Sequence, residues 1–339
     1  MVVRSQKIYS NGRGYAYCPT LYISMGFLTF PGETMSRIVI ALGGNALLQN
    51  GEKRDYETQY EHAYKTFESL RFVTEDNEVV ITHGNGPQVG DIQQSHDISG
   101  IGAYLHQSVA MSQGYIGEIL ANAYTNIKTK YNLRKNIFTI ITRVLVDEND
   151  PAFSNPEKPI GRYYSDAEVE EARKNGWIMK KFRDGWRRVV PSPDPRQILE
   201  EPVIEYLLHN GNLPIAVGGG GVPVVRKGEQ IHGIDAVIDK DLASSVLATA
   251  IRADFLMILT DVDNVYVNYG KPDQKGLHEV HVEEIEKYLK EGQFGEGSMK
   301  PKVMAAIRFI KNGGKKAFIT SIENSMNALS GRSGTIIVR

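Results

Sequence analysis

Residues 38–45 read Ile-Val-Ile-Ala-Leu-Gly-Gly-Asn, and this stretch decides the fold class. Its first five residues are all apolar and three are β-branched, which is typical of a strand buried on both faces. Residues 79–86 follow the same plan, with Val-Val-Ile-Thr leading into His-Gly-Asn-Gly. Because strands covered on both faces occur mainly in parallel sheets flanked by helices, the pattern predicts an α/β protein.

The same alternation continues to the end of the chain. Further strands are expected at residues 137–141, 213–217, 255–259, 316–320 and 335–338. Helices are expected at residues 57–70, 104–131, 239–250, 281–290 and 301–311. Another helix is expected to open at Asp194-Pro195, because Asp serves as a cap and Pro fits the first turn. Strands that alternate with helices predict a three-layer αβα sandwich with a mainly parallel central sheet.

The stretch from residue 147 to residue 190 interrupts this alternation. Apolar periodicity fades there, while Pro, Lys, Arg and aromatic residues become frequent. One helix signal remains, a capping box from Ser165 to Glu168. An ordinary surface loop is the alternative, but structureless loops of this length are uncommon in compact domains. We therefore expect a small flap subdomain that protrudes from the sheet.

Residues 1–34 precede the first strand and do not share its pattern. Residues 21–30 are mildly apolar and follow three basic residues, as in a signal peptide. Ser24, Gly26 and Thr29 interrupt that run, and no small-residue cleavage site follows it. We expect residues 1–34 to be a disordered or artefactual extension, with Met35 as the start of the folded domain.

The composition argues against several classes of partner. The chain has 39 basic and 40 acidic residues, so no excess charge favours nucleic acid or a membrane surface. No apolar run approaches the length that spans a bilayer. The single cysteine, Cys18, excludes an intramolecular disulfide and fits a reducing cytoplasm. The scattered histidines have no metal-binding spacing, so we expect no transition-metal site built by the protein.

Glycine-rich turns follow several of the expected strands and point to an anion-binding site. Gly295 to Lys302 joins small residues to a proline and a lysine at a helix start, where free N–H groups and a cation can bind a phosphoryl group. Lys240 stands between two aspartates at another expected helix start, where its positive charge opposes the helix dipole. This position is understandable if a bound anion lies beside it. Because ligands bind beyond the carboxyl ends of parallel strands, we expect the turns to converge on one phosphoryl-transfer site.

Motifs of the common nucleotide-binding folds are missing, since the chain has no P-loop, no dinucleotide fingerprint and no protein-kinase signature. The motifs that it does have, taken together, closely resemble those of carbamate kinases, within the amino acid kinase superfamily. The resemblance runs from about residue 36 to the C-terminus. It is carried by the stretches ALGGNAL (41–47), HGNGPQVG (83–90), NPEKPIG (155–161), GWRRVVPSP (185–193), GGGGVPV (218–224), AVIDKD (236–241), ILTDVD (258–263) and GSMKPK (297–302).

The resemblance implies a reversible reaction in which ATP and carbamate give ADP and carbamoyl phosphate, with Mg²⁺ accompanying the nucleotide. It implies a carbamate-binding and phosphoryl-binding lobe at residues 35–230 and a nucleotide-binding lobe at residues 231–339. The catalytic residues are then expected to be Lys158, Lys240, Asp241 and Lys302. The substrate contacts are expected to be Gly43, Gly44, Asn45, Gly84, Asn85 and Gly86. The nucleotide contacts are expected to be Gly219, Gly220, Asp261, Tyr266, Met299 and Lys302.

We expect a cytoplasmic protein from its single cysteine. The resemblance also implies a homodimer, and such enzymes often make ATP at the end of arginine or related nitrogen catabolism. Two alternatives stay open at this point. Other kinases of the superfamily, such as acetylglutamate and isopentenyl phosphate kinases, carry a lysine near the first glycine turn, where this chain has Ala41-Leu42. Lys158 of the flap is expected to take the role that this lysine has in the other kinases. A nucleotide-binding protein without turnover is the second alternative, and the intact set of lysines argues against it.

Overall fold

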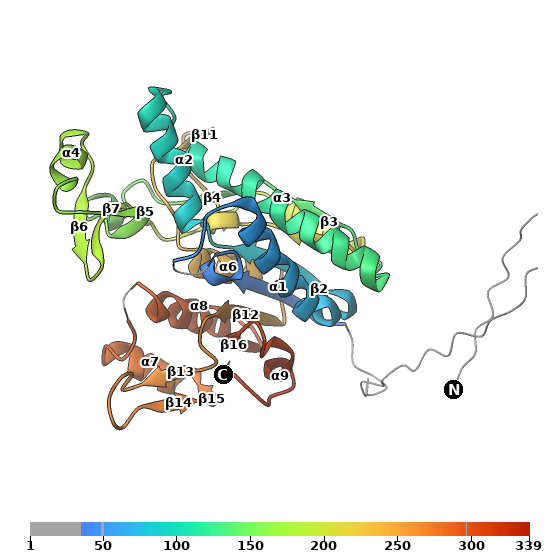
Figure 1. Cartoon of the computed structure of the whole chain (residues 1–339). Coiled ribbons are helices and arrows are strands. Elements are labelled where there is room, and N and C mark those ends of the chain that lie inside the picture. The colour runs from blue at the N-terminus through green and yellow to red at the C-terminus, as the bar shows by residue number, and fades with distance from the viewer. Residues whose placement is uncertain (1–34, 49–50, 296) are drawn as a thin grey trace, which may run out of the picture. The chain divides into compact units, whose positions relative to one another are not determined.

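Eight strands form the central sheet of the computed structural model, which describes residues 35–48, 51–295 and 297–339 (Figure 1). The expectation for residues 1–34 lies outside this range. The eight strands are β1 (Arg37–Leu42), β2 (Glu78–His83), β3 (Ile137–Thr139), β9 (Leu213–Ile215), β12 (Phe255–Thr260), β15 (Glu279–His281), β16 (Lys316–Ser321) and β17 (Thr335–Val338). Their order is β15-β17-β16-β12-β1-β2-β9-β3, and only β16 and β17 pair antiparallel.

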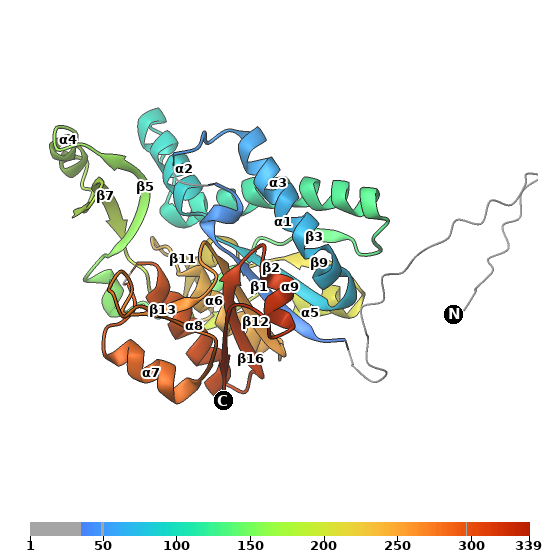
Figure 2. The same ribbon diagram turned by 60° about the horizontal axis from the view of Figure 1, so that its bottom comes forward.

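Helices cover both faces of this sheet, so the predicted αβα sandwich is confirmed. Along β1, Ile38 and Ile40 face one hydrophobic core while Val39 and Ala41 face another, as successive side chains of a strand must. The first core is completed by α1 (Tyr56–Asp76), α3 (Leu105–Tyr131) and α9 (Ser325–Leu329). The second is completed by α5 (Glu201–His209), α6 (Lys240–Ala250), α7 (Val282–Lys290) and α8 (Met299–Lys311) (Figure 2).

The flap expected at residues 147–190 contains a sheet and a hydrophobic core of its own. Strands β5 (Lys158–Tyr164), β7 (Gly185–Val190) and β6 (Met179–Phe182) lie in that order, and α4 (Val169–Lys174) packs on them (Figure 1). Its core consists of Tyr164, Val169, Ala172 and Met179. The flap meets the sandwich where β5 crosses α2 (Gly86–Ser99), a helix that the sequence analysis did not anticipate.

The prediction that a helix opens at Asp194-Pro195 is wrong. The chain there forms β8 (Gln197–Ile198), and the next helix, α5, begins only at Glu201. Contacts from distant parts of the chain decide this, because Asp194 accepts a 2.6 Å hydrogen bond from Arg308 and β8 pairs with β4 (Arg143–Leu145). Four further strands complete the sheets of the fold. The strands β10 (Val222–Lys227) and β11 (Gln230–Gly233) lie beside β4, and β13 (Val265–Val267) forms a hairpin with β14 (Lys275–Leu277).

Candidate active site

The first glycine turn starts where β1 ends, at the same edge of the sheet as the ends of β2 and β12. The Gly43 N–H donates to the Leu259 carbonyl at 3.0 Å, and a Cβ at Gly43 would lie only 2.8 Å from that oxygen. Gly43 is therefore required for the close approach of the turn to β12. A short 3₁₀ turn, Gly44–Ala46, follows it. The Asn45 side chain lies outside the described part of the structure.

A buried cluster of two lysines and one aspartate lies next to this turn. The ammonium group of Lys240, at the start of α6, pairs with one carboxylate oxygen of Asp241, and that of Lys302, in α8, pairs with the other at 3.0 Å. The exposed fractions of the three side chains are 10% for Lys240, 3% for Asp241 and 14% for Lys302. One carboxylate thus holds two cations side by side, and the cluster carries a net positive charge.

The pKa shifts in the cluster follow from its burial and its charges. Burial lowers the pKa of Lys240, and the attraction of Asp241 does not fully offset this. Burial alone would also lower the pKa of Lys302, but the Asp241 carboxylate outweighs it and raises that pKa. Burial opposes ionisation of Asp241, yet the two lysines hold its pKa well below the ordinary value. Asp241 is therefore ionised at neutral pH, between two cations.

The flap contributes a third lysine beside the same helix start. The Lys158 ammonium group pairs with Asp239 at 2.5 Å, and its side chain is 31% exposed. The other oxygen of the Asp239 carboxylate caps α6, because it accepts the N–H of Asp241 at 2.9 Å and that of Leu242 at 3.3 Å. Asp239 thus joins the flap to the helix that carries Lys240.

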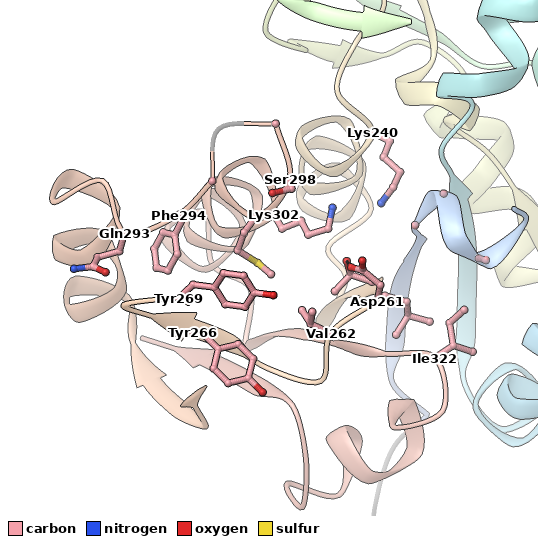
Figure 3. Close-up of a pocket in the computed structure, with 18 of the residues that line it drawn as sticks. Lys240, Asp261, Val262, Tyr266, Tyr269, Gln293, Phe294, Ser298, Lys302 and Ile322 are labelled. Carbon is pink, nitrogen blue, oxygen red and sulfur yellow. Dashed lines mark hydrogen bonds between the residues drawn. The ribbon is translucent and has the colours of Figure 1, made fainter. Parts of the chain in front are cut away.

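A cavity of about 610 Å³ opens in front of the lysine cluster (Figure 3). Gly43, Gly44, Lys240 and Lys302 form part of its wall, together with Asp261 after β12. At the other end the wall is aromatic and apolar, and it includes Tyr266, Tyr269, Phe294 and Met299. A cationic end and an aromatic end suit a ligand that carries both phosphates and a planar base.

The second glycine turn joins the first at the side chain of Lys240. The position of a Cβ at Gly84 lies 3.7 Å from a Lys240 side-chain carbon and 3.9 Å from the Gly44 nitrogen, so these three residues meet. Asn85 is buried, and its amide donates to Ser112 at 2.8 Å. Gly86 opens α2, whose N-terminus therefore faces this turn.

Gly219 and Gly220, which were expected to contact the nucleotide, do not line the cavity. Both are buried with positive φ, and a Cβ at Gly219 would lie 2.1 Å from the Asn85 amide. The sequence reasoning also missed cavity residues, among them Tyr269, Phe294 and Arg187. Arg187 lies within one of the recognised motifs, but nothing in the sequence alone showed that it faces the cavity.

Comparison with known proteins defines the class. A sequence profile of the amino acid kinase family matches residues 36–321, and the chain belongs to this family. The carbamate kinase of Thermoplasma volcanium is 70% identical over 304 residues, which cover 90% of this chain and 100% of that protein. The carbamate kinase of Thermococcus kodakarensis is 48% identical over 314 residues, covering 90% of this chain and 100% of that protein. Within the family, the chain therefore groups with the carbamate kinases.

A solved structure supports the same placement. Carbamate kinase from Giardia lamblia bound to AMP-PNP superposes with a TM-score of 0.83 at 45% identity, covering 90% of this chain and 98% of that one. The resemblance deduced from the sequence motifs is thereby confirmed. None of the helices in the described residues is long and apolar enough to cross a membrane.

Proposed function

We propose that this enzyme transfers a phosphoryl group reversibly between ATP and carbamate, giving ADP and carbamoyl phosphate. The observation that carries the proposal is the pair of ammonium groups, Lys240 and Lys302, held by Asp241 at the wall of the cavity. Such fixed charges stabilise a phosphoryl group in transit and need no reorganisation when the reaction occurs. The relatives' activity supplies the acceptor, carbamate.

The chemistry asks for positioning rather than for a general base. Carbamate already carries an anionic oxygen, so no proton has to be removed before it attacks the terminal phosphorus of ATP. Lys240 and Lys302 neutralise the charge on the transferring group, and Asp241 keeps both in place. Lys158 pairs with Asp239 and does not line the cavity in this structure, and closure of the flap brings it to the same group and shields that group from water.

The two glycine turns provide the acceptor side of the site. Gly44 and Asn45 donate hydrogen bonds to the phosphoryl group, and Gly43 holds their turn against β12 through its own hydrogen bond to Leu259. Gly84, Asn85 and Gly86 hold the carbamate. The proximity of Gly44, Gly84 and Lys240 supports this assignment, because the bond forms and breaks between the two turns. A pocket built from glycine backbone suits an acceptor as small as carbamate.

The aromatic end of the cavity takes the nucleotide. Tyr266 and Met299 contact the base, and Asp261 lies closer to the phosphates, since all three line the cavity. Gly219 acts indirectly by letting the Asn85 side chain pack against its backbone, and Gly220 does so by allowing the close approach of the Ile238 carbonyl.

Mg²⁺ accompanies the nucleotide and neutralises phosphate charge when it is bound. The residues present fit an ion held largely by phosphate oxygens and water. No group of three or more His, Cys, Asp or Glu side chains among the described residues could form a protein-built site, whereas Asp261 presents one exposed carboxylate to the cavity. Asp261 is accordingly the residue that would hold the ion beside the phosphates.

The proposal includes a homodimer that works in the cytoplasm. Met111 and Tyr115 are exposed apolar side chains one turn apart on α3, a surface that a second copy could cover. The single cysteine of the chain fits the reducing compartment. Sedimentation analysis of the purified protein tests the dimer, and a monomer at micromolar concentration would contradict it.

The direct test is ATP formation from ADP and carbamoyl phosphate by the purified enzyme. Parallel assays with ATP and N-acetylglutamate, or ATP and isopentenyl phosphate, measure the neighbouring activities of the fold. Of the three assays, we expect turnover only in the one with ADP and carbamoyl phosphate. ATP binding without phosphoryl transfer to any of these acceptors would identify a non-catalytic nucleotide-binding protein instead.

A further inference from the structure

Arg187 is a cation at the cavity wall to which the mechanism above gives no role. It lies on β7 and is the only residue of the flap's described part, 147–190, that lines the cavity. Its neighbour Arg188 serves a different surface, where it pairs with Asp97 at 3.2 Å and its guanidinium carbon lies 4.7 Å from the centre of the Trp177 ring. The alternation of side chains along a strand separates the two arginines.

The guanidinium group of Arg187 has no carboxylate partner among the described residues. Each of the three lysines of the site has one, namely Asp239 for Lys158 and Asp241 for Lys240 and Lys302. The Nε atom of Arg187 is buried and makes no hydrogen bond. Burial lowers the pKa of Arg187, but arginine remains charged throughout the physiological range. A partly buried, unpaired cation is unfavourable until an anion approaches it.

The rest of the guanidinium group is held firmly in place. Its Nη2 donates to the Gly161 carbonyl at 2.7 Å, and the Tyr163 ring lies 5.3 Å away. Gly161 is also where the flap crosses α2, since a Cβ at Gly90 would lie 2.1 Å from the Gly161 Cα. The arginine is thus anchored at the base of the flap, with donors left over for a ligand in the cavity.

We propose that Arg187 binds a phosphate oxygen of the substrate in this cavity, as a fourth cation beside the three lysines. The proposal rests on the proposed function, because that reaction brings phosphates into the cavity. A guanidinium group offers paired N–H donors that match phosphate geometry. The phosphate belongs either to the nucleotide or to carbamoyl phosphate, and binding measured with each ligand alone distinguishes the two.

Calorimetric titration of ADP alone and of carbamoyl phosphate alone tests the proposal with three variants. Arg187→Gln removes the charge but keeps a donor for the Gly161 carbonyl, and Arg187→Lys keeps the charge. Arg183→Met is the matched control, because this flap arginine is 95% exposed and does not line the cavity. The chain's two tryptophans, Trp177 and Trp186, both lie in the flap, so their emission reports whether it stays folded.

We expect Arg187→Gln to weaken binding of one ligand by at least about tenfold, the usual loss for a hydrogen bond to a charged group. Arg187→Lys should recover part of the lost affinity, and the affinities of Arg183→Met should stay within about twofold of those of the wild type. Unchanged affinity for both ligands, with unchanged tryptophan emission, overturns the proposal. If both Arg187 variants alter the tryptophan emission, the affinities of Arg187→Lys and Arg187→Gln are compared with each other. Equal affinities of the charged and the neutral variant would also overturn the proposal.

Failure of the proposed function gives a different result. In that case the wild-type enzyme would form no ATP from carbamoyl phosphate and ADP. ADP affinity could still depend on the charge at Arg187, so the two conclusions fail separately.

Discussion

The cations of the site come from two regions that are built differently. Lys240 and Lys302 belong to helices of the sandwich and share Asp241, and together these three side chains form what we term the floor of the site. Lys158 and Arg187 come from the flap, which has its own small core and is joined to the start of α6 by the ion pair between Lys158 and Asp239. The floor is fixed by folding itself, whereas the flap charges depend on a separately built element. The floor should therefore matter for both stability and rate, and the flap mainly for rate.

Asp241→Asn would break the floor most severely. It leaves two nearly buried ammonium groups side by side without a counter-charge, which typically costs about 3–5 kcal/mol. Urea denaturation at pH 7 should show this loss in the free energy of unfolding. Asp261→Asn is the matched control, because this exposed carboxylate should change stability by less than about 0.5 kcal/mol. Equal stability of the two variants would refute the claim that the floor is set by folding.

Lys240→Ala and Lys302→Ala test how much the floor contributes to the rate of phosphoryl transfer. Each removes one preorganised charge from the transferring phosphoryl group, so kcat should fall on the order of a hundredfold or more. The assay is ATP formation from carbamoyl phosphate with saturating ADP. Rates near the wild type in both variants would remove the proposed chemistry.

The floor was largely predictable from the sequence. Residues 38–45 predict the buried strand and its glycine turn because the run is continuously apolar. The Asp239-Lys240-Asp241 stretch predicts a capped helix start, and Asp239 does cap α6. The meeting of Lys240 with Lys302 at Asp241 followed from the family resemblance rather than from periodicity, since Lys302 lies 61 residues beyond its partner.

The flap and its surroundings were harder to predict, for physical reasons. Which side of β7 faces the cavity depends on strand register, and a sequence without clear alternation does not reveal it, so Arg187 was missed. The helix expected at Asp194 has good local signals, but Arg308, 114 residues away, takes the carboxylate instead. Helix α2 begins inside a glycine-rich motif and has little apolar periodicity, so only its first residues were interpreted, as part of a turn.

His83 makes the stability of the region around the floor depend on pH. It is buried at the end of β2, close to Lys240. Burial and the nearby Lys240 lower its pKa from 6.5 to about 4, and its Nδ1–H donates to the Gly84 carbonyl. Between these pH values the unfolded chain binds a proton that the folded protein does not. Stability therefore rises with pH across this window and is lost as the pH falls through it, by about 3 kcal/mol in total.

The measurement is the free energy of unfolding from pH 7 to pH 4 for the wild type and for His83→Gln. The difference between the two curves removes the contribution of all other titrating groups. The variant should show the shallower dependence on pH. Parallel curves would mean that His83 is not held neutral in the folded protein.

Lys158→Ala tests the flap and should have the smallest effect. The side chain is 31% exposed and pairs only with Asp239, so its loss should change stability by less than about 1 kcal/mol. The rate of ATP formation should fall about tenfold, because one of several charges around the phosphoryl group is lost while the floor stays intact. Lys180→Ala is the matched control, since this flap lysine pairs with Glu157 of the flap and not with Asp239 at the start of α6. A loss of rate as large as that of Lys240→Ala would show that Lys158 is as essential as the floor, and the distinction between the two regions would then fail.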